Sequence, residues 1–207
     1  MWDQRYGDKS YVYGTEPNDF LRENAQQIPK GKILCLAEGE GRNAVWLAQQ
    51  GYEVTAVDSS KIGLQKAEQL ALERGVSIST VCADLGHFDM GVDQWDGIVS
   101  IFCHLPKPLR QRVHSDCIAA LRSGAVMLLE AYTPQQLTYK TGGPPVAEMM
   151  MDSTLLKTEL EGLEFLHLKE CVRDIHEGEL HSGPGAVVQL LARKHSSFRR
   201  LTHYVIT

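Results

Sequence analysis

The stretch Lys32–Asp58, KILCLAEGEGRNAVWLAQQGYEVTAVD, decides the fold of this chain. Its first residues, Ile33–Ala37, form an apolar run typical of a strand that is buried on both faces. A turn with Gly39 and Gly41, a helical pattern and a second apolar run ending at Asp58 follow. This order predicts a βαβ unit with a right-handed crossover. Ligands of such sheets bind beyond the carboxyl ends of the strands, so the turn and Asp58 are expected to face one cleft.

The turn is compatible with two kinds of nucleotide cofactor. The segment Gly39–Ala44 satisfies the dinucleotide pattern G-x-G-x-x-A, and Asp58 stands near the spacing of a ribose-binding acid. A dinucleotide places its pyrophosphate on the helix N-terminus, where carboxylates at Glu38 and Glu40 would repel it. S-adenosylmethionine has no phosphate, and its sulfonium and ammonium groups are cations. The acidic turn therefore favours S-adenosylmethionine, and a nicotinamide cofactor stays the alternative.

Length and composition indicate one domain, residues 1–207, of ordinary globular character. The formal net charge of −5, from 26 acidic and 21 basic residues, disfavours a general nucleic-acid binder. No apolar run reaches the roughly 18–20 residues that cross a bilayer, and the N-terminus lacks the apolar core of a signal peptide. We therefore expect a cytoplasmic protein that acts on a small molecule and binds neither nucleic acid nor a membrane.

Residues 1–29 form an aromatic arm and a helix ahead of the first strand. Within the arm, Tyr11 and Tyr13 lie between two glycines, and Asn18 stands at the start of the helix. Because the glycines supply hinges and the aromatic rings supply a cover, the arm is expected to fold over the cofactor cleft as a lid.

Alternating strand and helix patterns continue after Asp58 and then give way to two adjacent strands. Expected helices cover 60–74, 107–122 and 153–160, and expected strands cover 78–83, 95–102, 125–132, 164–173 and 186–193. The last two strands, joined by a polar loop, predict an antiparallel hairpin at the sheet edge. The fold class is therefore α/β: a doubly wound, Rossmann-like, seven-stranded, mostly parallel sheet with a C-terminal antiparallel hairpin strand. This core covers residues 30–194, and the sequence assigns no role to the tail, residues 195–207.

These segments resemble the class I S-adenosylmethionine-dependent methyltransferases across about residues 30–194. Within that superfamily the chain is most similar to the small tellurite-resistance-type and thiopurine-type group. The residues that carry the resemblance are Ala37–Ala44, Val57–Ser60, Ala83–Leu85, Trp95–Val99, Leu121–Ala125 and, in the arm, Trp2 and Tyr13–Asn18. The resemblance implies S-adenosylmethionine as the cofactor.

The resemblance also implies roles for individual residues. Asp58 would accept hydrogen bonds from both ribose hydroxyls, and Asp84 would bind the adenine amino group. Gly39 and Gly41 would let the backbone approach the methionine part of the cofactor. The implied cofactor-binding residues are Ala37, Glu38, Gly39, Gly41, Asp58, Ser59, Asp84, Leu85, Ile101, Phe102 and Cys103.

Two positions depart from the family pattern. The family's first-strand acid, which helps to hold the ammonium end of the cofactor, falls at Cys35, and Glu38 is the nearest replacement. The family's first turn glycine falls at Ala37, which fits the turn only if its φ is negative. We therefore expect a negative φ at Ala37.

The sequence contains no motif that identifies the methyl acceptor. Methyl transfer from a sulfonium is a direct displacement, in which the protein mainly aligns the acceptor and at times removes its proton. His104, whose ordinary pKa is near neutrality, and Tyr132 follow two strand ends and are the candidate catalytic residues. The irregular segment 133–145, with Gly142 and Gly143, is the candidate substrate loop. The group resemblance indicates a thiol, a metalloid oxyanion or a similar acceptor.

Two other functions stay open, and no metal is expected. The loop 173–181 has two histidines among carboxylates but fits no zinc spacing. An NAD(P)-dependent reductase would explain the G-x-G-x-x-A match, although the chain has no Tyr-x-x-x-Lys pair. A catalytically silent cofactor-binding protein would explain the missing acid at Cys35.

Overall fold

The computed structural model describes residues 2–7, 10–178 and 181–195. Its strands are β1 (Lys32–Leu36), β2 (Glu53–Asp58), β3 (Ser79–Cys82), β4 (Trp95–Ile101), β5 (Leu121–Tyr132), β6 (Leu163–Glu177) and β7 (His181–Lys194). Its helices are α1 (Trp2–Arg5), α2 (Asp19–Asn24), α3 (Arg42–Gln49), α4 (Lys61–Glu73), α5 (Lys107–Ala120) and α6 (Ser153–Glu159). Single 3-10 turns lie at Ala25–Gln27, Pro134–Thr138 and Ala147–Met149.

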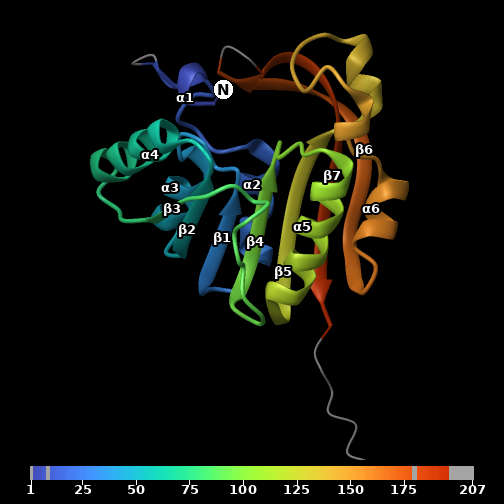
Figure 1. Ribbon diagram of the computed structural model, residues 1–207, viewed down its shortest axis with the longest axis horizontal. Coiled ribbons are helices and arrows are strands. Elements are labelled where there is room, and N and C mark those ends of the chain that lie inside the picture. Colours follow the sequence, from blue (N-terminus) through green and yellow to red (C-terminus); the bar gives the residue numbers. More distant parts are fainter. Residues whose placement is uncertain (1, 8–9, 179–180, 196–207) are drawn as a thin grey trace, which may run out of the picture.

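The strands form one seven-stranded sheet in the order β3-β2-β1-β4-β5-β7-β6 (Figure 1). The first five are parallel, and β7 runs antiparallel to both β5 and β6. The predicted fold class is therefore confirmed. The strand order reverses between β1 and β4, which places the crevice of an open α/β sheet at their carboxyl ends.

Both faces of the sheet are covered, which explains the continuous apolar runs of the strands. On β5, Val126 and Leu128 face the layer that contains α2 and α3. The alternate residues Met127 and Leu129 face α5 and α6 on the other side. This alternation follows from the period of two along a strand.

The C-terminal hairpin is longer than predicted. Register extends from Leu163↔Lys194 to Glu177↔His181, so most of the expected polar loop belongs to the two strands. The polar residues of this segment pair with the other strand through their backbone groups. The side chains of Arg173 and Glu177 have buried partners, which stabilises this extension. Beyond the Tyr132↔Val187 pair the hairpin passes the end of β5 and reaches across the upper edge of the sheet toward α1 (Figure 1).

One boundary differs from the sequence prediction for a simple reason. Helix α5 ends at Ala120, and β5 begins at once, because buried Leu121 pairs with Trp95. In the arm, Asn18 is the N-cap of α2 and its side chain accepts the Leu21 N–H.

Among the residues described, no helix is long and apolar enough to cross a membrane. Of the predicted tail, all but His195 lies outside the described residues.

A buried ion cluster joins α5 to α6. Arg110 is 1% exposed, and its Nε and Nη2 donate to Glu159 Oε2 and Oε1 at 3.1 and 3.0 Å. His114 Nδ1 lies 2.8 Å from Glu159 Oε2. Burial would raise the pKa of Glu159, but His114 and Arg110 lower it below its ordinary value. The carboxylate is therefore ionised at neutral pH and holds α6 against α5.

We predict that Glu159→Gln lowers the free energy of unfolding by about 3 kcal/mol at pH 7, because it leaves Arg110 buried without a counter-ion. Denaturant unfolding measures the loss. The difference from wild type should shrink as the pH falls through the lowered pKa of Glu159, since protonation removes the same charge. As a control, Glu53→Gln removes an exposed partner of Lys32 and should change stability by less than about 1 kcal/mol. Equal effects of the two substitutions would contradict the cluster's role.

Candidate active site

The carboxyl ends of the two central strands hold strained backbone. Ala37 follows β1 with φ of 49°, and Phe102 follows β4 with φ of 51°. Left-handed conformations are unfavourable for residues with a Cβ atom, and they concentrate at functional sites. Because β1 and β4 flank the point where the strand order reverses, this strain lies where an α/β sheet binds its ligand.

The prediction of a negative φ at Ala37 is wrong, since the observed φ is 49°. The two residues that follow Ala37 are bound to the end of β2. Glu38 N–H donates to the Val57 carbonyl at 3.1 Å, and Gly39 N–H donates to Asp58 Oδ2 at 2.8 Å. These bonds hold the backbone that follows Ala37, which has a left-handed conformation that alanine adopts with strain.

Asp58 lies at the end of β2 with its carboxylate held in place. Its Oδ2 accepts the Gly39 N–H, and its Oδ1 accepts the Ser60 N–H at 2.7 Å. Burial raises the pKa of Asp58, and the two backbone amides oppose that shift. Ser59, between Asp58 and the cap of α4, is exposed. Each carboxylate oxygen accepts one backbone bond and retains the capacity to accept another.

Glu38 occupies the N-terminus of α3. Its Oε1 accepts the N–H groups of Asn43 and Ala44 at 2.9 and 2.7 Å. Burial raises the pKa of Glu38 to about 7, although these amides and Arg42 lower it. The donors that a pyrophosphate would use at this helix are thus already bound by a carboxylate of the chain.

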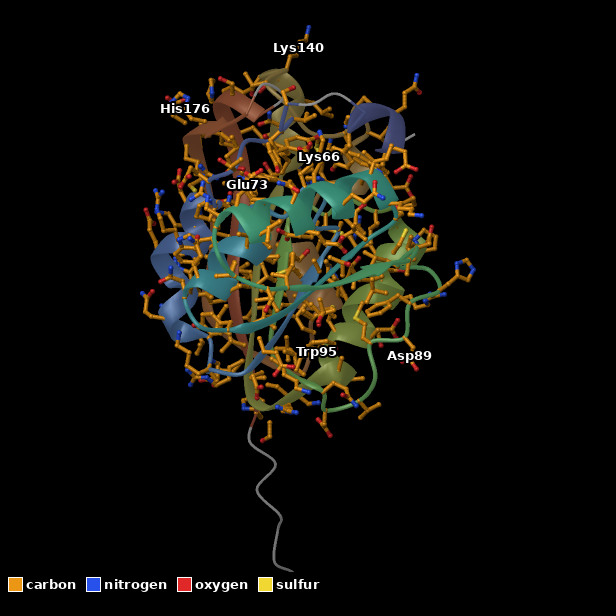
Figure 2. The ribbon with its side chains drawn as sticks, turned by 90° about the vertical axis from the view of Figure 1, so that its left-hand side faces the viewer. Lys66, Glu73, Asp89, Trp95, Lys140 and His176 are labelled. Atoms are coloured by element: carbon orange, nitrogen blue, oxygen red, sulfur yellow. The ribbon has the colours of Figure 1, made fainter. Side chains whose placement is uncertain are left out.

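Glu40, the second acid of the turn, binds the arm and α4. Its Oε2 accepts the Val12 N–H at 2.8 Å, and its Oε1 accepts from Lys66 Nζ at 2.7 Å. Lys66 Nζ also donates to the Ser10 carbonyl at 2.8 Å. Figure 2 shows Lys66 on α4, near the end of the molecule that carries the arm. The negative charge of Glu40 is therefore compensated, and the repulsion predicted from it is removed.

The two turn glycines meet different neighbours. A Cβ atom on Gly41 would lie 2.4 Å from the Cβ of Ala67, so the close approach of α3 to α4 requires this glycine. A Cβ atom on Gly39 would lie 2.6 Å from Tyr6 Oη. Tyr6 of the arm is 4% exposed and thus covers the open side of the turn. The sequence reasoning missed Tyr6, because no spacing pattern reveals a contact between such distant segments.

The rest of the arm contacts either Tyr6 above the glycine turn or the start and body of α4. Tyr13 packs edge-on to Tyr6, with ring centroids 6.4 Å apart. Asp3 Oδ1 accepts the Ser60 hydroxyl at 2.5 Å and anchors the start of the arm on α4. Tyr11 lies against α4, where its hydroxyl donates to the Lys66 carbonyl at 3.2 Å. The arm thus covers the glycine turn, through Tyr6 and Tyr13 more than through Tyr11.

Three rings gather at the ends of β4 and β5. The ring centroids of Phe102 and Tyr132 are 4.6 Å apart, and those of His104 and Tyr132 are 5.6 Å apart. The Tyr132 N–H donates to His104 Nε2 at 3.0 Å, so the proton of a neutral imidazole is on Nδ1. A Cβ atom on Gly143 would lie 2.8 Å from the Tyr132 ring, which places the predicted loop and its neighbour Gly142 against this aromatic group.

The other predicted site residues lie at the ends of β3 and β4. Ile101 and Cys103 are buried, and burial raises the pKa of the Cys103 thiol to about 12, which excludes a thiolate at neutral pH. Asp84 is exposed after β3, with Oδ1 accepting the Gly86 N–H at 2.6 Å, and Leu85 is buried. Within the described part of the chain, no group of three or more His, Cys, Asp or Glu side chains could hold a metal ion.

Comparison with known proteins finds methyltransferases among the proteins that this chain resembles. A model described as "Methyltransferase domain" matches residues 33–124, from β1 into β5. A 2-heptyl-1-hydroxyquinolin-4(1H)-one methyltransferase from Mycobacteroides abscessus is 28% identical over 140 residues, 65% of this chain and 61% of that protein. A thiopurine S-methyltransferase from Bordetella petrii is 31% identical over 106 residues, 51% of this chain and 45% of that protein. The chain thus spans roughly half of the length of these relatives.

Solved structures confirm the fold over nearly the whole chain. The TehB protein of Haemophilus influenzae superposes with a TM-score of 0.69 at 21% identity, covering 93% of this chain and 65% of that one. A structure described under the conversion of a disulfide bond into a thioacetal group during echinomycin biosynthesis gives a TM-score of 0.74 at 18% identity, covering 95% and 92%. Together with the domain match, these likenesses confirm the predicted resemblance to class I S-adenosylmethionine-dependent methyltransferases.

We predict that Ala37→Gly leaves stability unchanged or raises it by up to about 1 kcal/mol. Glycine removes the strain of the left-handed conformation, and the greater freedom of the unfolded chain offsets part of the gain. Thermal and denaturant unfolding measure the change. The matched control is Ala67→Gly in the interior of α4, which should cost about 1 kcal/mol or more. A comparable loss in both variants would contradict the strain at Ala37.

Proposed function

We propose that this chain, which carries a methyltransferase domain on a class I fold, is an S-adenosylmethionine-dependent methyltransferase that acts on a small molecule. The observation that carries the proposal is the Glu38 carboxylate on the first amides of α3. That contact occupies the phosphate site of a dinucleotide and leaves a negative group near the glycine turn. The G-x-G-x-x-A pattern is satisfied here without the donors that a nicotinamide dinucleotide needs.

The residues around the turn fit an adenosyl cofactor. Asp58 would hold the two ribose hydroxyls, because its oxygens are oriented by Gly39 and Ser60 and can still accept. Glu38 would attract the ammonium group in place of the acid that is missing at Cys35. Asp84 and the backbone of Leu85 would bind the adenine. When bound, S-adenosylmethionine supplies an activated methyl group on a cationic sulfur.

The acceptor that best suits the site is a small aromatic molecule with a thiol or hydroxyl nucleophile. Phe102, His104 and Tyr132 provide flat faces at the strand ends, and aromatic rings pack well on such faces. Both curated relatives are named for heteroaromatic acceptors, which supports the same choice. In this arrangement the chain mainly orients the acceptor and excludes water, and the Tyr6–Tyr13 pair covers the cleft as a lid.

Whether the protein must remove a proton from the acceptor depends on whether the acceptor is a thiol or a hydroxyl. An aromatic thiol is already largely ionised at neutral pH and needs no base. For a hydroxyl acceptor, His104 is the candidate base only once its bond to the Tyr132 N–H opens, because that bond occupies the Nε2 lone pair and the proton of the neutral ring is on Nδ1. Burial raises the pKa of Tyr132 well above its usual value, so its phenol stays protonated and serves as a wall or a hydrogen-bond donor.

Thermal unfolding with separate ligands tests the cofactor, and product formation tests the activity. S-adenosylhomocysteine in excess should raise the melting temperature, since a ligand at 100 times its Kd stabilises by about 2.7 kcal/mol. NADH and NADPH should have no effect. Methyl transfer is then assayed with an aromatic thiol, a heteroaromatic hydroxyl compound and tellurite. A shift with a nicotinamide cofactor alone would overturn the proposal, and cofactor binding without turnover of any acceptor would favour a silent binding protein.

Asp58→Ala should weaken binding of S-adenosylhomocysteine by about 1.5–3 kcal/mol, the scale of hydrogen bonds to a charged group, which is roughly 10- to 150-fold in Kd. Isothermal titration calorimetry measures the change. Asp96→Ala is the control, because Asp96 accepts from Lys32 and Arg122 at the opposite edge of the sheet and should leave Kd unaltered. An unchanged Kd in Asp58→Ala would remove Asp58 from the site.

Cofactor affinity should also rise with pH through the neutral range. The pKa of Glu38 is raised to about 7, and its ionised form would pair with the ammonium of the cofactor. A ligand that needs the ionised form gains about tenfold in affinity between pH 6 and pH 8. Titrations with S-adenosylhomocysteine at several pH values should show this rise, and Glu38→Gln should abolish it. A flat wild-type profile would exclude Glu38 as the ammonium partner.

A further inference from the structure

A cluster of buried charged and polar side chains lies under the arm and the hairpin. We refer to it as the buried charge cluster, and its members are Asn18, Arg42, Glu130, Arg173 and Glu177. These residues come from the arm, α3, β5 and β6, so four segments distant in sequence meet at one place. No sequence pattern indicates the cluster, and neither the cofactor site nor the acceptor site described above includes its carboxylates.

Glu130 is the centre of one half of the cluster. It is fully buried in β5, with 0% exposure. Asn18 Nδ2 donates to its Oε1 at 2.8 Å, and Gln189 Nε2 donates to its Oε2 at 2.6 Å. Arg173 binds both oxygens, with Nε donating to Oε2 at 3.1 Å. Glu130 thus joins the arm to both strands of the hairpin.

Glu177 is the centre of the other half and lies near the hairpin tip. Asn18 Nδ2 and Arg173 Nη2 donate to its Oε1 at 2.8 and 3.1 Å. Arg42 Nη2 donates to its Oε2 at 2.6 Å. Burial would raise the pKa of Glu177, but the two arginines lower it, so the carboxylate stays charged. The Arg42–Glu177 pair therefore ties the start of α3 to the hairpin.

The cluster spans the distance between the two halves of the proposed active site. Arg42 directly follows Gly41 of the cofactor turn. Glu130 precedes Tyr132 by two residues on β5, so both side chains point to the same face of the sheet. At the hairpin tip, a Cβ atom on Gly178 would lie 2.2 Å from the Val12 carbonyl, so the tip packs directly on the arm. The glycine turn at Gly41, the aromatic group at Tyr132 and the arm are therefore all connected to the buried charge cluster.

We infer that Glu177 and Glu130 are positioning residues that couple the cofactor turn to the hairpin and the arm, so that cofactor binding orders the acceptor half of the site. The inference rests on the proposed function. Its physical basis is that separating a buried ion pair leaves an uncompensated charge, so Arg42 and Glu177 move together or not at all. A ligand that fixes the start of α3 then restricts the hairpin tip and the arm as well.

Hydrogen exchange of the full chain, with and without excess S-adenosylhomocysteine, tests the coupling. In wild type, amides of the turn (residues 39–45) and of the hairpin (residues 172–177) should both exchange at least about tenfold more slowly with ligand. Glu177→Gln should retain the protection of the turn and lose that of the hairpin. If this variant does not fold, Arg42→Gln cuts the same link from the other side and carries the same expectation.

The matched control is Glu159→Gln, which removes a buried, arginine-bound carboxylate between α5 and α6. It should lower stability yet keep both ligand-induced protections, so a general loss of stability cannot mimic the effect. Equal hairpin protection in wild type and Glu177→Gln would overturn the inference, because the hairpin would then respond without the cluster. Protection of the turn alone in wild type would overturn it too. No protection anywhere would overturn the proposed function, and this inference with it.

Discussion

The proposed cofactor site depends on the contact between the Glu38 carboxylate and the first amides of α3. Exposed helix N-termini attract phosphate, and the glycine turn that precedes α3 has the pattern of a dinucleotide site. Glu38 occupies those amides itself. Asp58 and Glu38 both lie beside the glycine turn, and two carboxylates suit a cationic adenosyl cofactor better than a pyrophosphate. In the proposed function, this one side chain favours an adenosyl cofactor over a dinucleotide.

Strained backbone and buried charge occur together at the carboxyl edge of the sheet. Ala37 and Phe102 adopt left-handed conformations there, and Glu130 and Glu177 are buried with their arginine partners. Such features cost stability, and they persist because the surrounding contacts hold them in place. They fix the ends of β1, β4 and β5 relative to the arm and the hairpin. The same edge carries the glycine turn and the aromatic group, which is consistent with a site that must align two reactants.

The sequence predicted the parts of the fold that depend on local patterns. Apolar runs and turn residues located the parallel strands, and Asp58 lies at the end of β2 as predicted, because its apolar run ends there. Tyr6, Glu130 and Arg173 were missed, since their roles arise from contacts between distant segments that no spacing encodes. The charge argument from Glu40 was wrong for the same reason, because its partner Lys66 lies on another helix.

The most direct test of the account is a crystal structure with S-adenosylhomocysteine. The account predicts the ribose hydroxyls on Asp58 and the ammonium near Glu38, with Glu38 still bound to the amides of Asn43 and Ala44. It also predicts that Tyr6 and Tyr13 stay over the cleft or move to cover the ligand. A ligand whose carboxylate displaces Glu38 from those amides, or whose ribose lies away from Asp58, would contradict the central claim.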